Sequence, residues 1–146
     1  MTEQGLCWLA GTVGYASQPC AQLQSLNIEG ITRMRDAGLE GLAVGCRNLK
    51  YFNCRDCVDI TDRGIIALAK GCKKLKVINV YACAKISDRA MRVIGKNCPD
   101  LRSINCGRLN KLTDAGMKPL GDGCHRIQNV GLGFWVPSSS LKQSPK

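Results

Sequence analysis

A short alternation of polar and apolar residues, followed by apolar residues at helical spacing, recurs along this chain of 146 residues. In the stretch CRNLKYFNCRDCVDITDRGIIALAKG, Phe52 and Cys54 alternate with more polar neighbours. This alternation predicts a short strand with the two side chains facing inward. Ile65, Leu68 and Ala69 then follow the i, i+3, i+4 spacing of one helix face. The pattern therefore predicts one strand and one helix in this unit.

The unit repeats with a fixed period of 26 residues. Three residue types keep this period in a single register: Cys20, Cys46, Cys72, Cys98 and Cys124; Asn27, Asn53, Asn79 and Asn105; Asp36, Asp62, Asp88 and Asp114. Repeats of this length cannot bury their apolar faces alone and are stable only as a stack. The sequence thus predicts a tandem array.

Each predicted helix carries residues that suit its two ends. Thr61 or Asp62 can cap the N-terminus, where a carboxylate also favours the positive end of the helix dipole. Gly71 marks the C-terminus, and we expect it to take the left-handed conformation that glycine tolerates. Pro119 falls near the second turn of the last helix, and we expect it to shorten or bend that helix.

Stacking of such units predicts an α/β solenoid. Neighbouring parallel strands lie about 4.8 Å apart, whereas packed helices need about 8–10 Å. We therefore expect a curved parallel sheet on the concave face and helices on the convex face. We assign residues 1–134 to the array, as about four repeats of 26 residues plus partial ends. The Pro- and Ser-rich stretch 135–146 is predicted to be a disordered tail.

The apolar spacing within the unit is similar to that of a known repeat class. Leu49, Phe52, Cys54, Cys57 and Ile60 follow the spacing of a leucine-rich repeat, and the period lies within the range of that class. The resemblance implies the α/β leucine-rich-repeat solenoid as the fold.

A second motif resembles a narrower group. Cys-x-x-Leu recurs at 46–49, 72–75 and 98–101, and Ile-Thr-Asp, Ile-Ser-Asp or Leu-Thr-Asp follows each copy. This combination resembles the cysteine-containing leucine-rich repeats of F-box proteins, which are the substrate receptors of cullin-RING ubiquitin ligases. The resemblance implies a non-catalytic module that binds a protein partner on its concave face, with no cofactor and no small-molecule substrate.

The resemblance leaves two roles open. An F-box is a helical segment that precedes the repeats in that family, and we expect none in this sequence. The chain is then expected to be either a fragment of a longer receptor or a binding protein that never carried the box. Similar repeats occur in axonemal and other scaffolding proteins, so a structural subunit of a larger assembly is the alternative.

The outward positions of the predicted strands supply the candidate binding residues. They are polar, charged or aromatic: Asn27, Glu29, Tyr51, Asn53, Arg55, Asn79, Tyr81 and Asn105. The four asparagines form either a polar ladder that satisfies itself or a set of hydrogen-bonding groups for a ligand backbone. Tyrosine and arginine are favoured at the energetic centres of protein interfaces.

The cysteines are predicted to be core residues rather than metal ligands. The positions of Cys54 and Cys57 hold Ile28 and Ile31 in the preceding unit, and isoleucine cannot ligate a metal. A free cysteine packs as a small apolar residue. Because His125 is the only histidine and there is no phosphate-binding loop, a histidine-based triad or multi-histidine metal site is excluded, and we expect no enzyme.

The net charge and the cysteine content bear on the class of partner and on the cellular compartment. The formal net charge of +10 is interpreted as scattered surface charge, with an acidic protein partner as the next hypothesis and nucleic acid as the least favoured. Ten cysteines without a recognisable secretory signal indicate a reducing compartment, the cytoplasm or the nucleus. No apolar run is long enough to cross a bilayer.

Overall fold

The computed structural model describes residues 20–133, in which strands and helices alternate. The elements are β1 Ser25–Asn27, α2 Asp36–Gly45, β2 Tyr51–Asn53, α3 Asp62–Gly71, β3 Val77–Asn79, α4 Asp88–Asn97, β4 Ser103–Asn105, α5 Asp114–Gly123 and β5 Asn129–Gly131. The predicted tail over 135–146 and the start of the predicted array lie outside the described residues, so the assigned boundaries stay predictions.

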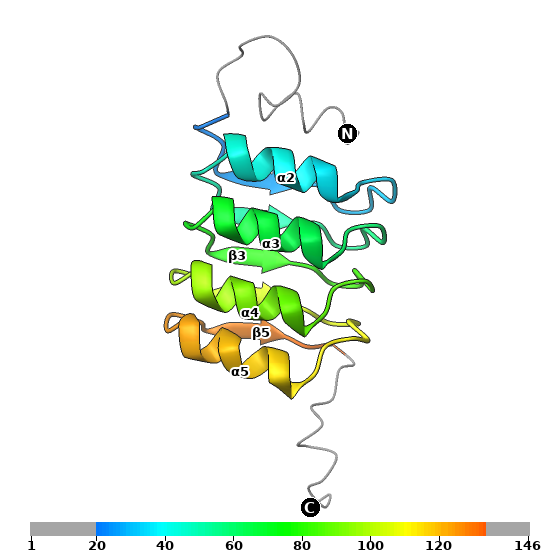
Figure 1. Ribbon diagram of the computed structural model, residues 1–146, viewed down its shortest axis with the longest axis vertical. Helices are drawn as coiled ribbons and strands as arrows, with labels where there is room; N and C mark the ends of the chain where they lie inside the picture. Colours follow the sequence, from blue (N-terminus) through cyan, green and yellow to red (C-terminus); the bar gives the residue numbers. More distant parts are fainter. Residues whose placement is uncertain (1–19, 134–146) are drawn as a thin grey trace, which may run out of the picture.

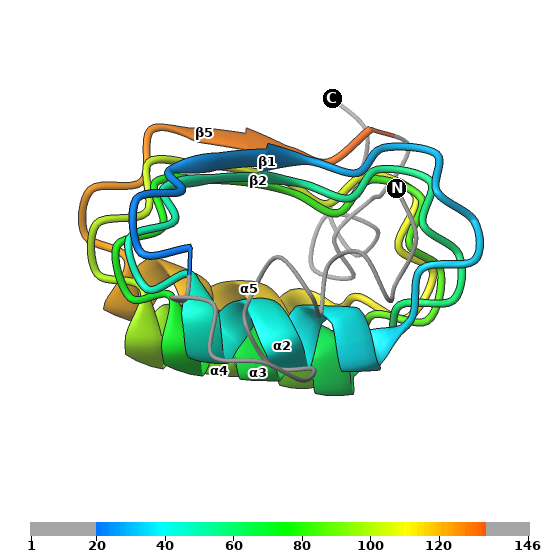
Figure 2. The ribbon, with the colours of Figure 1, turned by 90° about the horizontal axis from the view of Figure 1, so that it is seen from above.

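The strands form one parallel sheet in the order β1-β2-β3-β4-β5. Each strand pairs with the next in the register of the repeat, so that Leu26 is opposite Phe52, and Phe52 is opposite Ile78. The sheet forms one layer and the helices form the other (Figures 1 and 2). This arrangement confirms the α/β solenoid that the alternating pattern predicted.

The core lies between the two layers. Inward strand residues such as Phe52 and Ile78 are buried, as are helix residues such as Ile65 and Leu68. Cys54 and Cys57 are fully buried in the same cluster. These thiols therefore fill the interior, as the replacement of cysteine by isoleucine in the preceding unit indicated.

The strand-to-helix edge of the solenoid consists of residues 28–36, 54–62, 80–88 and 106–114. Here the repeating aspartates join neighbouring repeats. Asp62 accepts hydrogen bonds from the backbone N–H of Ser87, at 2.7 Å, and from the Ser87 hydroxyl. Asp36 makes the same pair of bonds to Thr61, and Asp88 makes it to Thr113.

The helix cap itself is the hydroxyl residue that precedes the aspartate. Thr61 Oγ1 accepts a hydrogen bond from the N–H of Arg63, and Ser87 Oγ accepts one from the N–H of Arg89. The sequence left Thr61 and Asp62 as alternative caps, and the structure assigns them different tasks. Thr61 caps its helix, whereas Asp62 holds the next repeat.

The helix-to-strand edge consists of residues 43–50, 69–76, 95–102 and 121–128, and close backbone contact holds it together. A Cβ on Gly71 would lie 2.2 Å from the carbonyl oxygen of Ala43, and one on Gly123 would lie 1.8 Å from that of Gly95. The expected left-handed conformation at these glycines is wrong, because neither has a positive φ. Glycine is required here by the close approach of neighbouring helices.

Left-handed backbone occurs instead in the turn that follows each strand. Gly30, Asp56, Ala82 and Arg108 have φ between 57° and 74° and are themselves spaced by 26 residues. Only one of the four is glycine, so three side chains tolerate a conformation that costs about 1–2 kcal/mol. The repeat backbone imposes this turn on whatever residue the sequence supplies.

Pro119 does not shorten its helix, contrary to the sequence expectation. α5 has ten residues, as do α2, α3 and α4. The carbonyl of Pro119 faces Gly95 of α4, where a Cβ would lie only 2.3 Å away. Because Gly95 has no side chain, α5 packs tightly against α4 despite the hydrogen bond that proline removes.

Candidate protein-binding surface

The outward strand residues share one surface, which we call the sheet face. Asn27, Asn53, Asn79 and Asn105 occupy equivalent positions at the ends of β1 to β4. Glu29, Arg55 and Tyr81 follow two residues later in their repeats. The strand residues between the outward ones, such as Phe52 and Ile78, are buried in the core between the sheet and the helices. The predicted binding residues therefore lie in register on the other side of the sheet, which forms the layer opposite the helices (Figure 2).

The asparagines hold the turn that follows each strand. Asn53 Oδ1 accepts a hydrogen bond of 3.0 Å from the N–H of Arg55, and Asn79 Oδ1 accepts one of 3.0 Å from the N–H of Tyr81. Asn27 and Asn105 make the same bond in their own repeats. Their oxygens are thus satisfied within each repeat, and no asparagine–asparagine hydrogen bond links the described strands.

Charged and aromatic side chains contact one another along the ends of the strands. The guanidinium of Arg55 lies 4.7 Å from the centre of the Tyr81 ring, and that of Arg108 lies 5.8 Å from it. Arg55 Nε is also 3.6 Å from Glu29 Oε1. We call Glu29, Arg55, Tyr81 and Arg108 the Tyr81 cluster; it crosses four repeats.

The ring of Tyr81 is held in position by packing against the following repeat. A Cβ on Gly107 would lie 2.8 Å from the ring, so the ring rests directly on the backbone of the following repeat. Cations on an aromatic face stabilise such an arrangement by about 0.5–1 kcal/mol each when exposed. Arg55 and Glu29 keep 46% and 44% of their side chains exposed, so the cluster is ordered and still accessible.

Two further residues belong to this surface, and the sequence analysis missed them. Arg108 contacts Tyr81, and Asp56 Oδ2 lies 3.2 Å from Arg55 Nε. Both occupy the left-handed turn position, one residue beyond the outward column that was considered. The period of 26 already marks this position, so extending the column search by one residue would have found both.

Tyr51 stands apart from the cluster. It begins β2, in register with Ser25 and Val77, and it is 45% exposed. Of the predicted residues, the structure thus brings Glu29, Asn53, Arg55 and Tyr81 into mutual contact; Asn53 joins them through a 3.0 Å hydrogen bond to Glu29. Tyr51 lies at the opposite end of the strands.

Most of the buried thiols have a raised pKa; the exception is Cys83, whose pKa is lowered by its side-chain hydrogen bond with Cys54. Burial raises the pKa of Cys57 to about 11, and its Sγ donates to the carbonyl of Ile28 at 3.1 Å. Burial likewise raises the pKa of Cys72 to about 12. A thiol with such a pKa stays protonated at neutral pH and is a poor nucleophile and ligand. Within residues 20–133, no group of three potential ligands is placed to hold a metal ion.

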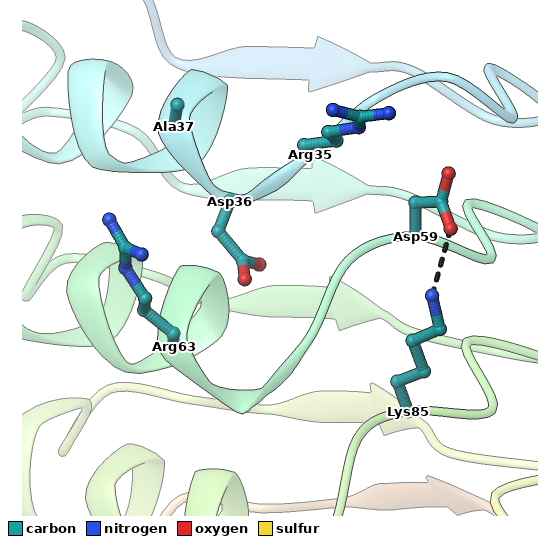
Figure 3. A pocket seen from close by; sticks show the side chains of 6 residues that line it. All are labelled: Arg35, Asp36, Ala37, Asp59, Arg63 and Lys85. Atoms are coloured by element: carbon teal, nitrogen blue, oxygen red, sulfur yellow. Dashed lines mark hydrogen bonds and ion pairs between the residues drawn. The ribbon is translucent and has the colours of Figure 1, made fainter.

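One hollow of about 550 Å³ lies on the strand-to-helix edge (Figure 3). It is lined by charged residues of both signs and by one alanine: Arg35, Asp36, Ala37, Asp59, Arg63 and Lys85. Lys85 Nζ donates to Asp59 Oδ1 at 2.8 Å and lowers the pKa of that carboxyl. Arg63 is paired with Glu40. The lining contains no histidine, cysteine or hydroxyl nucleophile.

None of the helices within residues 20–133 is long and apolar enough to cross a membrane. A family model described as "Leucine Rich repeat" matches residues 45–69, which is the unit whose spacing predicted that class. The fold is that of a leucine-rich-repeat solenoid, and this unit matches the repeat class. No curated protein matches the sequence significantly.

Two solved structures share the leucine-rich-repeat fold. A chain of the yeast Rad7–Elc1 complex is 18% identical, with a TM-score of 0.73 over 90% of this chain and 32% of the yeast chain. The C-terminal domain of Caenorhabditis elegans tropomodulin is 14% identical, with a TM-score of 0.67 over 97% of this chain and 87% of that domain's chain. This chain therefore spans about a third of the yeast chain. The repeat class supports a protein-binding module.

Proposed function

We propose that this chain recognises a protein partner through the sheet face, with the Tyr81 cluster at the centre of the interface. The observation that carries the proposal is the placement of Arg55 and Arg108 against one ordered tyrosine ring. Tyrosine and arginine dominate the energetic centres of interfaces. Because these side chains are already ordered, little conformational entropy remains to be lost on binding.

The electrostatics of the cluster favour a partner with both polar and apolar groups. Glu29 and Asp56 balance the charge of Arg55, so the surface is not a simple cation patch. The exposed ring of Tyr51 offers a second contact at the other end of the strands. A segment that crosses the sheet face would contact both tyrosines, with the asparagine column between them.

The finer role that we propose is the substrate-recognition segment of an F-box-type ubiquitin-ligase receptor or a relative. The cysteine-containing repeat motif supports it. The structural likeness to a longer chain found in a complex is compatible with it. The compartment that we propose is a reducing one, the cytoplasm or the nucleus, because the sequence is rich in cysteine.

A scaffold subunit is the second candidate role, because the fold also matches nearly the whole tropomodulin C-terminal domain. The two roles differ in what happens to the partner. A ligase receptor shortens the partner's half-life, and the variant Tyr81→Ala would restore it. A scaffold leaves the half-life unchanged, so a pulse-chase measurement of the partner separates the two.

Site-specific photo-crosslinking tests the proposed surface. A crosslinking amino acid would replace Tyr81, and in a matched control it would replace Arg92, an exposed residue of α4 on the helix side. We expect partner capture at position 81 and none at position 92, with capture reduced by Arg108→Ala. Equal capture at both positions would contradict the assignment of the sheet face.

A further inference from the structure

The positive charge of the chain gathers on the helix-to-strand edge. The four segments of this edge carry two carboxylates, Asp100 and Asp122, and nine cations: Arg47, Lys50, Lys70, Lys73, Lys74, Lys76, Lys96, Arg102 and Arg126. The four segments of the strand-to-helix edge carry seven carboxylates and six cations. The charge is therefore unevenly distributed between the two edges.

A hollow of about 420 Å³ lies within this basic edge, between the ends of α2 and α3. Four cations line it together with two small residues: Ala43, Arg47, Lys70, Gly71, Lys73 and Lys74. The small residues leave room for the hollow, because Gly71 packs its backbone directly on Ala43. The site is thus a recess with basic walls.

The four cations have no counter-charge within residues 20–133. Ion pairs on this edge occur only near its far end, where Arg126 pairs with Asp100 and Lys118 pairs with Asp122. Lys74 Nζ donates instead to the amide oxygen of Asn48 at 2.7 Å, which leaves its charge uncompensated. Unpaired cations that surround one recess create a positive potential there.

The helix dipole accounts for only part of this arrangement. Lys70 lies in the last turn of α3, where a cation favours the negative end of the helix. Arg47, Lys73 and Lys74 lie beyond the helix ends, and the dipole effect falls off within the last turn. These three cations therefore need another explanation.

The chain itself supplies no acidic segment for the recess. Residues 1–19 contain a single carboxylate, Glu3, and residues 134–146 contain two lysines and no acid. An acidic segment of a partner would supply the counter-charge that these residues lack. No aromatic residue lines the recess, whereas single-stranded nucleic acids are bound with the help of aromatic stacking.

We propose that this recess binds a segment of a protein partner that is rich in Asp and Glu. The surface goes beyond the proposed sheet-face function, because it lies at the helix-to-strand edge and shares no residue with the Tyr81 cluster. Carboxylates entering between Arg47, Lys70, Lys73 and Lys74 would each meet an exposed cation. Binding of this kind is weak at each contact and sensitive to salt.

Binding of a fluorescent poly-glutamate peptide, followed by anisotropy at low salt, tests the proposal. In the test variant, Lys70→Gln, Lys73→Gln and Lys74→Gln remove three charges at the recess. In the matched control, Lys85→Gln, Lys111→Gln and Lys118→Gln remove the same number elsewhere. We expect the test variant to bind about tenfold more weakly and the control to stay within about twofold of the unmodified chain.

Three outcomes would overturn the proposal. The first is equal weakening in both variants, which would make net charge the only cause. The second is no saturable binding of the peptide to the unmodified chain. The third is tighter binding of a single-stranded oligonucleotide or of anionic phosphatidylserine vesicles under the same conditions. Crosslinking at position 81 reports on the sheet face alone, so the two proposals can fail separately.

Discussion

The two edges of the solenoid hold neighbouring repeats together by different means. On the strand-to-helix edge, Asp36, Asp62 and Asp88 each accept two hydrogen bonds from the next repeat. On the helix-to-strand edge, bare backbones touch at Gly71, and the Cys72 thiol donates to the carbonyl of Cys46 at 3.2 Å. One edge relies on charged groups for cohesion, and the other relies on neutral ones.

This difference explains where charge is available for partners. Six carboxylates on the strand-to-helix edge are occupied: Asp36, Asp62 and Asp88 bond to the next repeat, and Glu29, Asp56 and Asp59 pair with nearby cations. The contacts that join repeats at the helix-to-strand edge are uncharged, so the lysines of this edge are not needed to hold the repeats together. Charges that are not needed for folding can serve binding. The predictions below test whether the two edges differ in this way.

The largest expected effect comes from high pH, which acts on the buried thiols of both edges. Burial raises the pKa of Cys57 and Cys106, on the strand-to-helix edge, to about 11. Burial raises the pKa of Cys46 and Cys124 from the ordinary value of 9.0 to about 11, and that of Cys72 and Cys98 to about 12. The folded chain therefore keeps protons that the unfolded chain releases. Its free energy of unfolding should fall above about pH 9, by about 1.4 kcal/mol per pH unit for each thiol, until the folded-state pKa is reached.

Urea unfolding at a series of pH values measures this slope. Cys72→Ala provides the control, because it removes one buried thiol whose pKa is raised and should reduce the slope by about 1.4 kcal/mol per pH unit. A slope that is the same in the unmodified chain and in Cys72→Ala would contradict the assignment of the loss to buried thiols.

A glycine substitution at the helix-to-strand edge should have the next largest effect. Gly71→Ala places a Cβ against the backbone oxygen of Ala43, which forces α2 and α3 apart and should cost about 3 kcal/mol. Gly121→Ala is the matched control, because nothing lies within 4 Å of its added Cβ. Alanine in the helix should then stabilise the chain by about 0.5–1 kcal/mol.

Thermal or urea unfolding measures the change in stability of the two glycine variants. Opposite signs are expected for substitutions of identical chemistry. A stabilising Gly71→Ala would show that the helices are not in the close contact described here.

A smaller effect is expected in the turns of the strand-to-helix edge. Ala82 has a φ of 59°, which costs about 1–2 kcal/mol for a residue with a side chain. Ala82→Gly should remove this cost, and after the extra entropy of glycine in the unfolded chain the gain should be about 0.5–1 kcal/mol. The reverse change, Gly30→Ala, should destabilise; if the two changes shift unfolding in the same direction, the explanation by turn strain is wrong.

The period of the sequence was sufficient to predict the fold. Three columns in one register indicated a stack, and the alternation at Phe52 and Cys54 indicated which strand side chains face the core. What the period could not show was contact between repeats. Nothing in the spacing distinguishes an aspartate that caps its own helix from one that bonds to the next repeat, because that depends on the distance between stacked units.

The candidate surface was predicted in outline for the same reason. Register placed Glu29, Arg55 and Tyr81 on one side of the sheet, whereas the left-handed turn that brings Arg108 to Tyr81 is a property of the backbone. Three of the four residues at that position are Asp56, Ala82 and Arg108, and alanine and arginine give no signal of a positive φ. Glycine at the helix ends gave a signal that was real, but its cause was close packing.

The central claim is that charge maintains one edge of the solenoid and is dispensable for the stability of the other. The most direct measurement compares the free energy of unfolding of Asp62→Ala with that of Lys73→Ala, each against the unmodified chain in urea. Asp62→Ala should lose about 2–3 kcal/mol, because it leaves the N–H and hydroxyl of Ser87 without their acceptor. Lys73→Ala should change the free energy by less than about 0.5 kcal/mol. Equal losses in the two variants would contradict the claim.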